Sequence, residues 1–149
     1  MKVNHNPMGV FEFGASKELI VRLKHDADIV ESITELAKSK GIKAASFTAM
    51  GALKRAMLGY YDQRAHEYRK IRIDSASEIA SCSGNVSLKD GKPFVHAHAV
   101  LSDEKGNTRA GHLLEGTVFA AEVHLQQLEG PELERKYDET TELMLWNMT

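Results

Sequence analysis

The chain has 149 residues, of which 42% are hydrophobic and 27% are charged. This size and balance suit one globular domain, and we expect a single domain over residues 1–149 with its core at roughly residues 13–147. Nineteen basic and twenty-one acidic residues give a net charge of −2, so no overall positive charge favours binding to nucleic acid.

The sequence contains neither a membrane span nor an export signal. The first residues, MKVNHNPMGVF, include one lysine but no apolar run behind it. No stretch approaches the roughly 20 apolar residues of a membrane-spanning helix. We therefore expect a cytoplasmic protein without membrane association. The single cysteine, Cys82, excludes an internal disulfide and lies in an alternating run that suits a small, unreactive core side chain.

The amino-terminal third contains one strand and one helix. The run ELIVRL (18–23) resembles a strand, and an amphipathic pattern follows it and ends at Gly41. Asp26 precedes this pattern, where its carboxylate can accept the first free backbone N–H groups of a helix. The apolar residues that recur at helical spacing are Ile29, Ile33, Leu36 and Ala37.

The remainder of the chain is dominated by strand-like runs separated by Gly, Asp and Asn. Short turns within SLKDGK and SDEKGN predict hairpins, which place the run PFVHAHAVL between two neighbouring strands. The pattern predicts an α+β domain, mainly antiparallel, with one principal helix. The predicted strands cover residues 43–50, 56–61, 67–73, 76–88, 93–101 and 117–128, and ELMLW (142–146) is expected to add a last strand or a terminal latch.

Three histidines form the main candidate site. His96 and His98 are two residues apart, so on a strand they share one face. A turn around Lys105–Asn107 would carry His112 back beside them. Three neutral imidazoles leave one position of a tetrahedron open, as in catalytic zinc sites. The alternative is a set of hydrogen-bonded core or surface residues, which is our interpretation of the four other histidines, His5, His25, His66 and His124.

Charged residues near the third histidine are candidates for roles beside a metal. Glu115 could act as a general acid or base if it is buried near the ion. Arg109 or Arg55 could bind an anionic substrate through its planar guanidinium. The alternative for each is an ordinary solvated charge on a loop or sheet edge.

Three segments resemble the plant and prokaryote conserved (PPC) domain in its stand-alone prokaryotic form. They are AMGALKRAMLGYY, EIASCSGNVSLKDGKPFVHAHAVLSDEKGN and AGHLLEGTVFAAEVHL. The resemblance implies a curved, mainly antiparallel sheet packed with a helix, a homotrimer, and a metal, zinc, held by His96, His98 and His112. It also implies a fold similar to that of acetolactate decarboxylase, a zinc lyase with three histidine ligands. From that more distant relative we carry over the type of metal ligand but not the reaction.

The same resemblance implies a link to DNA that the sequence does not support. Plant members place this domain after AT-hooks, whereas this chain has no GRP-centred basic hook. The hook is the part that enters the minor groove. Plant members also generally lack the histidine trio, so the two branches need not share a biochemical function.

Three functions remain open from the sequence. The first is a trimeric metal-binding protein that handles a small anionic ligand, by metal-assisted lyase or hydrolase chemistry if it is an enzyme. The second is a DNA-binding or regulatory module that acts through trimer surfaces, for which EYRKIRI (67–73) offers Lys70 and Arg72 on one strand face. The third is a structural trimer scaffold.

Overall fold

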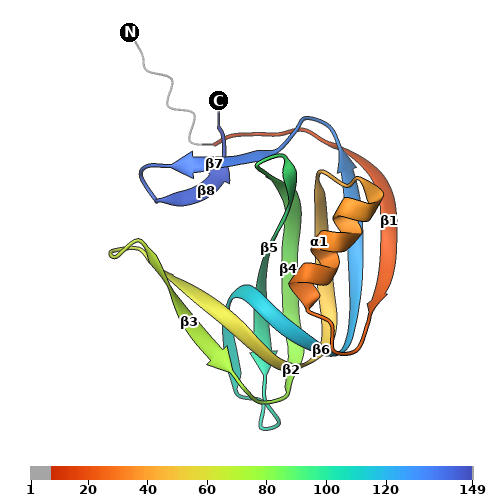
Figure 1. The fold of residues 1–149 in the computed structure, drawn as a ribbon, viewed down its shortest axis with the longest axis vertical. Helices are drawn as coiled ribbons and strands as arrows, with labels where there is room; N and C mark the ends of the chain where they lie inside the picture. The colour runs from red at the N-terminus through yellow and green to blue at the C-terminus, as the bar shows by residue number, and fades with distance from the viewer. Residues whose placement is uncertain (1–7, 149) are drawn as a thin grey trace.

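The computed structural model describes residues 8–148. Over these residues one helix and eight strands form the fold, and all the strands belong to one sheet (Figure 1). The α+β class with one principal helix is confirmed. In chain order the elements are β1 (Gly14–Leu23), α1 (Ile29–Lys40), β2 (Ala45–Asp62), β3 (Glu67–Ile73), β4 (Ser77–Lys89), β5 (Lys92–Ser102), β6 (Thr108–Glu129), β7 (Glu134–Asp138) and β8 (Leu143–Trp146).

Four strands form a closed circuit of neighbours. β2 pairs with β6, β6 with β5, β5 with β4, and β4 pairs again with β2. The first half of β2 lies between β6 and β4, and its second half lies between β6 and β3. A sheet whose pairing returns to its start must be strongly curved. Every pairing of named strands is antiparallel except that of β4 with β7, which confirms the mainly antiparallel sheet.

The core lies between α1 and the sheet. Ile29, Ile33 and Ala37 on the inner face of α1 are buried, and α1 packs against β5 and β6. Opposite them, alternate residues of β5 are buried in the same cluster. Cys82 belongs to this cluster, and burial raises the pKa of its thiol to about 11. The predicted position of this thiol in the core is therefore confirmed.

The helix begins at a different aspartate from the one predicted. Asp28, not Asp26, is the N-cap residue, and its Oδ1 accepts a hydrogen bond of 2.9 Å from the Glu31 N–H. Asp26 has a positive φ of 66° and instead pairs with Lys54. Gly41 ends the helix in the left-handed conformation, as predicted.

The structure also settles the extent of β2 and the role of the last apolar stretch. The runs at 43–50 and 56–61 belong to one continuous strand, β2, which bulges near Gly51 instead of ending there. Gly51 has a φ of 135°, and a Cβ on it would lie 2.1 Å from the Ala120 carbonyl oxygen, so no larger residue fits. ELMLW does supply a last strand, β8, which pairs with β7.

A helix that crosses a bilayer needs about 20 largely apolar residues. None of the helices within residues 8–148 is long and apolar enough to cross a membrane.

We expect Asp28→Ala to lower the free energy of unfolding by about 2 kcal/mol. The reason is that Asp28 Oδ2 also accepts a bond of 2.8 Å from the buried Gly116 N–H, so the substitution leaves two backbone donors without partners. Urea denaturation followed by circular dichroism measures the change. Asp26→Ala is the control, and a loss as large as that of Asp28→Ala would contradict the assignment of the cap.

Candidate functional site

Two histidines share the face of β5 that points away from the core. Val95, Ala97 and Ala99 alternate with them and are buried, so the pleat turns His96 and His98 to the opposite side. His96 is half-buried and His98 is exposed. β5 lies between β4 and β6, as predicted, which holds both histidines on a paired strand.

A tight turn brings the third histidine to the same face. Asp103 Oδ1 accepts hydrogen bonds of 2.9 Å from the backbone N–H groups of Lys105 and Asn107, which closes the loop between β5 and β6. β6 then runs antiparallel to β5 with His112 directly opposite His98. The turn inferred from the sequence is therefore present, and it aligns the third histidine with the first two.

The three imidazoles converge. The His96 ring centroid lies 5.1 Å from those of His98 and His112, and the centroids of His98 and His112 are 5.7 Å apart. One ring nitrogen from each residue lies within 4.8 Å of the other two. His112 Nδ1 is buried without a hydrogen-bond partner. A buried nitrogen without a partner is costly, and a metal ion is one group that would satisfy it, so this trio could hold a metal.

Burial favours the neutral form of two of these rings, those of His96 and His112. Burial lowers the pKa of His96 to about 4, and the positive charge of Arg135 adds to the effect. Burial also lowers the pKa of His112, with further contributions from His98 and Arg135. A neutral imidazole is the form that binds a metal. The site therefore favours the ligand form of both His96 and His112.

The trio lines a cavity of about 630 Å³. Tyr68 of β3 and Phe94 of β5 add aromatic rings to its lining, and the Tyr68 ring centroid is 5.4 Å from that of His112. The β7–β8 hairpin supplies the facing side through residues 143–145. Figure 1 shows this hairpin at the upper left, across from the hairpin of β2 and β3.

Contacts between the two hairpin turns border this cavity. Tyr61 Oη donates a hydrogen bond to the Thr141 carbonyl oxygen, and His66 Nδ1 lies 3.0 Å from Glu142 Oε2. Both Tyr61 and Glu142 line the cavity. The carboxy-terminal hairpin is therefore part of the site, whereas the sequence indicated only a last strand or a terminal latch.

Arg135 on β7 is the main site residue that the sequence did not indicate. Its side chain lines the cavity, yet only 6% of the residue is exposed. It donates hydrogen bonds to Ser87 Oγ, the Met144 carbonyl oxygen and Asn85 Oδ1, at 3.0, 3.1 and 3.2 Å. The only signal was its place in the polar segment ELERKYD, which is typical of a solvated turn.

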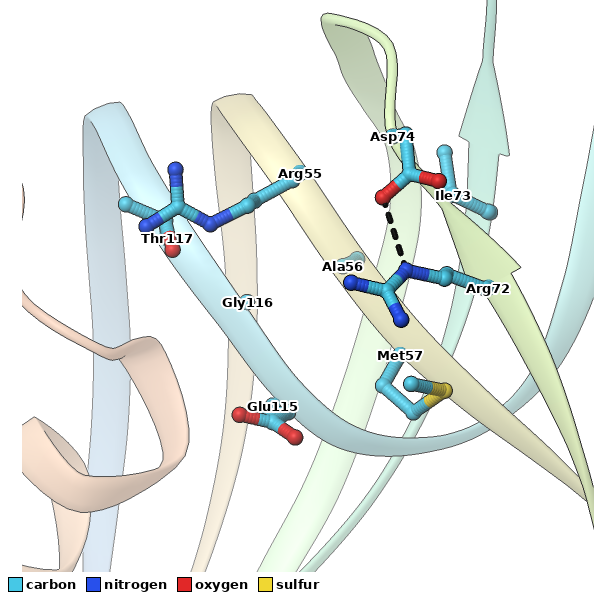
Figure 2. A pocket seen from close by; sticks show the side chains of 9 residues that line it. All are labelled: Arg55, Ala56, Met57, Arg72, Ile73, Asp74, Glu115, Gly116 and Thr117. Atoms are coloured by element: carbon cyan, nitrogen blue, oxygen red, sulfur yellow. Dashed lines mark hydrogen bonds and ion pairs between the residues drawn. The ribbon is translucent and has the colours of Figure 1, made fainter.

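The charged residues expected beside the metal lie elsewhere. Arg55 and Glu115 line a separate pocket, where Arg72 and Asp74 also pair (Figure 2). Arg109 is exposed and donates to the Arg72 carbonyl oxygen. None of the three predicted residues lines the cavity of the histidines. Within one chain these three residues therefore lie apart from the histidines, and their role beside a metal stays a prediction.

The other described histidines are polar surface or edge residues. His25 Nδ1 lies 2.8 Å from the Phe119 carbonyl oxygen, and His124 Nε2 lies 3.7 Å from Glu18 Oε1. Both histidines are about half exposed, at 54% and 52% of their side chains. His5 lies outside the described residues.

We expect the metal-free protein to lose stability as the pH falls from 6.5 towards 4. In this range the unfolded chain protonates His96, whereas the folded chain resists protonation because its pKa is lowered to about 4, so protons favour the unfolded state. Urea denaturation over a pH series measures the fall. His96→Asn should make it shallower and His124→Asn should not; identical pH profiles for wild type and His96→Asn would contradict this account.

Solved structures with a similar fold support the architecture. The metal-containing protein of Archaeoglobus fulgidus is 46% identical, with a TM-score of 0.91 over 94% of this chain and 99% of that one. A plant- and prokaryote-conserved protein of Pyrococcus horikoshii is 38% identical, with a TM-score of 0.90 over 94% and 97%. A candidate DNA-binding protein of Ralstonia eutropha is 25% identical, with a TM-score of 0.78 over 87% and 90%.

More distant matches agree with the fold alone or cover a small part of the relative. Acetolactate decarboxylase from Bacillus subtilis has a TM-score of 0.50 at 14% identity, over 83% of this chain and 56% of that one, which confirms the expected similarity of fold. The bifunctional protein GlmU of Synechococcus is 28% identical over 120 residues, or 80% of this chain. This chain spans only 18% of that curated relative.

The family comparison covers most of the chain. Residues 11–129 match the model of the Plants and Prokaryotes Conserved domain. The segments that carried the resemblance in the sequence, including the HxH pair and the stretch around His112, lie inside this match. The chain belongs to the Plants and Prokaryotes Conserved domain family.

Proposed function

We propose that this protein binds a zinc ion through His96, His98 and His112 and handles a small anionic ligand beside it. The convergence of three ring nitrogens within 4.8 Å of one another carries the proposal. The description of the Archaeoglobus relative as metal-containing supports it. The cytoplasmic location expected from the sequence stays a prediction.

The donor set favours zinc over harder ions. Mg²⁺ and Ca²⁺ prefer oxygen ligands, whereas three imidazole nitrogens suit zinc and other transition metals. Neither Glu nor Asp belongs to the cluster among the described residues. Three protein ligands leave a coordination position for water or a ligand, which is the arrangement of catalytic zinc sites.

The cavity suits chemistry on a small molecule. Zinc held there would polarise a carbonyl group or activate water, which are the reactions of lyases and hydrolases. Arg135 would attract and orient an anion, because its guanidinium keeps its charge inside the cavity. The apolar lining from Phe94 and residues 143–145 would exclude bulk water from the bound molecule.

DNA binding is the weaker candidate, although the Ralstonia neighbour is described as a candidate DNA-binding protein. Two of the three basic residues of β3 have acidic partners. Arg69 pairs with Asp62, and Arg72 pairs with Asp74. Together with the net charge of −2, these pairs weaken the attraction to a phosphate backbone. A purely structural scaffold would be supported if neither metal nor ligand bound.

We expect protein purified without a histidine tag to contain about one zinc ion per chain. Replacing two ligands together, as His96→Ala/His98→Ala, should remove the metal, because one imidazole alone holds zinc weakly. Elemental analysis by mass spectrometry measures the content, and His124→Ala is the matched control. Equal and negligible zinc in wild type and the double variant would refute the proposal.

We also propose that three copies of the chain assemble, as the family resemblance implies. Ile20 of β1 and Met50 of β2 are 78% and 63% exposed. Both residues border a shallow pocket on the surface of β1, β2 and β6. Large exposed apolar side chains that lie together are typical of a protein–protein contact, so this face is a candidate interface between copies.

We expect a mass of about three chains from sedimentation equilibrium, in keeping with the symmetric assemblies that most oligomers form. Ile20→Glu/Met50→Glu should dissociate the assembly, because charges without partners would be buried at the contact. Val10→Glu, at an exposed residue outside this face, serves as the control. A wild-type protein that sediments as a monomer would contradict the trimer.

A further inference from the structure

We propose that the histidine cavity selects an organic monocarboxylate with an apolar, preferably aromatic, body, and that Arg135 binds the carboxylate. This inference rests on the proposed function, since it names the class of ligand for the same site. Arg135 is then the residue that determines specificity.

The first observation is that Arg135 is buried without a counter-ion. Only 6% of the residue is exposed, and its three hydrogen-bond acceptors, on Ser87, Asn85 and Met144, are all neutral. Among the described residues no carboxylate pairs with it. Burying a charge without a partner is costly, and an anionic ligand in the cavity would supply the missing charge.

The second observation is that the guanidinium is held in a fixed plane. Its Cζ lies 5.3 Å from the Phe94 ring centroid and 5.1 Å from that of Trp146. Trp146 Nε1 donates to the same Ser87 Oγ that accepts from Arg135 Nε. A guanidinium has more N–H groups than the three bonds to protein use. A fixed planar donor with N–H groups to spare matches the two oxygens of a carboxylate.

The third observation concerns the rest of the lining. Lys89 and Arg135 bring two positive charges to the cavity and Glu142 brings one negative charge, so before any metal is counted the lining carries one net positive charge. A bound zinc ion would add two more positive charges, so the cavity favours an anion over a neutral molecule, and its single arginine fork matches one carboxylate group. Most of the remaining surface is aromatic or aliphatic, from Tyr68, Phe94 and residues 143–145. Such a lining favours an apolar body attached to the carboxylate.

Simple probes test the ligand class without any variant. Binding of benzoate, benzamide, acetate and inorganic phosphate to the zinc-loaded protein is measured by calorimetry. Fluorescence offers a second readout, because Trp146 is the single tryptophan of the chain and lies against Arg135. We expect benzoate to bind at least about tenfold more tightly than benzamide, which has the same shape but no charge. Acetate should bind more weakly than benzoate, because it lacks an apolar body.

A variant separates the arginine from the metal. Arg135→Lys keeps the charge but loses the planar fork, and we expect it to weaken benzoate binding at least about tenfold while zinc content stays at the wild-type level. Arg22→Lys, on the exposed side of β1, is the matched control and should bind benzoate like wild type. Thermal unfolding of each variant checks that it is folded.

The outcomes distinguish this inference from the zinc proposal. If zinc is absent from wild-type protein, the metal proposal fails, and benzoate binding to that protein still tests Arg135. If zinc is present but benzoate and benzamide bind equally, or phosphate binds more tightly than benzoate, the ligand class is wrong. Unchanged benzoate affinity in folded Arg135→Lys would show that another group, such as the metal, holds the carboxylate and would overturn the role of Arg135.

Discussion

The long strand β6 organises the molecule because it changes partners along its length. It begins beside β5, continues beside β2 and ends between β2 and β1. His112 occupies the position where the first partner gives way to the second, paired with His98 on β5 and with Gly59 on β2. The third imidazole is therefore placed by ladder hydrogen bonds on both sides, which gives it more precision than a loop could provide.

Burial lowers the pKa of two histidines and of the arginine in the cavity, but it leaves the two kinds of side chain in different charge states. It keeps His96 and His112 neutral by lowering their pKa values, which suits metal ligands. It also lowers the pKa of Arg135, but a guanidinium starts so high that it stays protonated. Two neutral histidines thus lie beside a permanent cation. The three neutral hydrogen-bond acceptors around Arg135 offset part of the cost of burying its charge.

Local pattern predicted those parts of the fold and site that depend on neighbours in sequence. The two-residue period of β5 and the turn before β6 brought His96, His98 and His112 together correctly. The N-cap was misassigned because Asp26 and Asp28 are alike in sequence, and the bonds that distinguish them, from the Glu31 and Gly116 N–H groups to Asp28, form only in the fold. Arg135 was missed because two of its acceptors lie 48 and 50 residues away. Glu115 was expected near the metal because it is close to His112 in sequence, whereas the fold places it with Arg55 in a separate pocket.

The residues that line the site come from two parts of the chain, the family domain and the carboxy-terminal hairpin. The family match ends at residue 129, whereas Arg135 and residues 143–145, which face the histidines across the cavity, all come later in the chain. The part that would hold the metal and the part that would choose the ligand are therefore separate segments. Exchange of the hairpin could redirect such a scaffold to another small molecule while its histidines stayed in place.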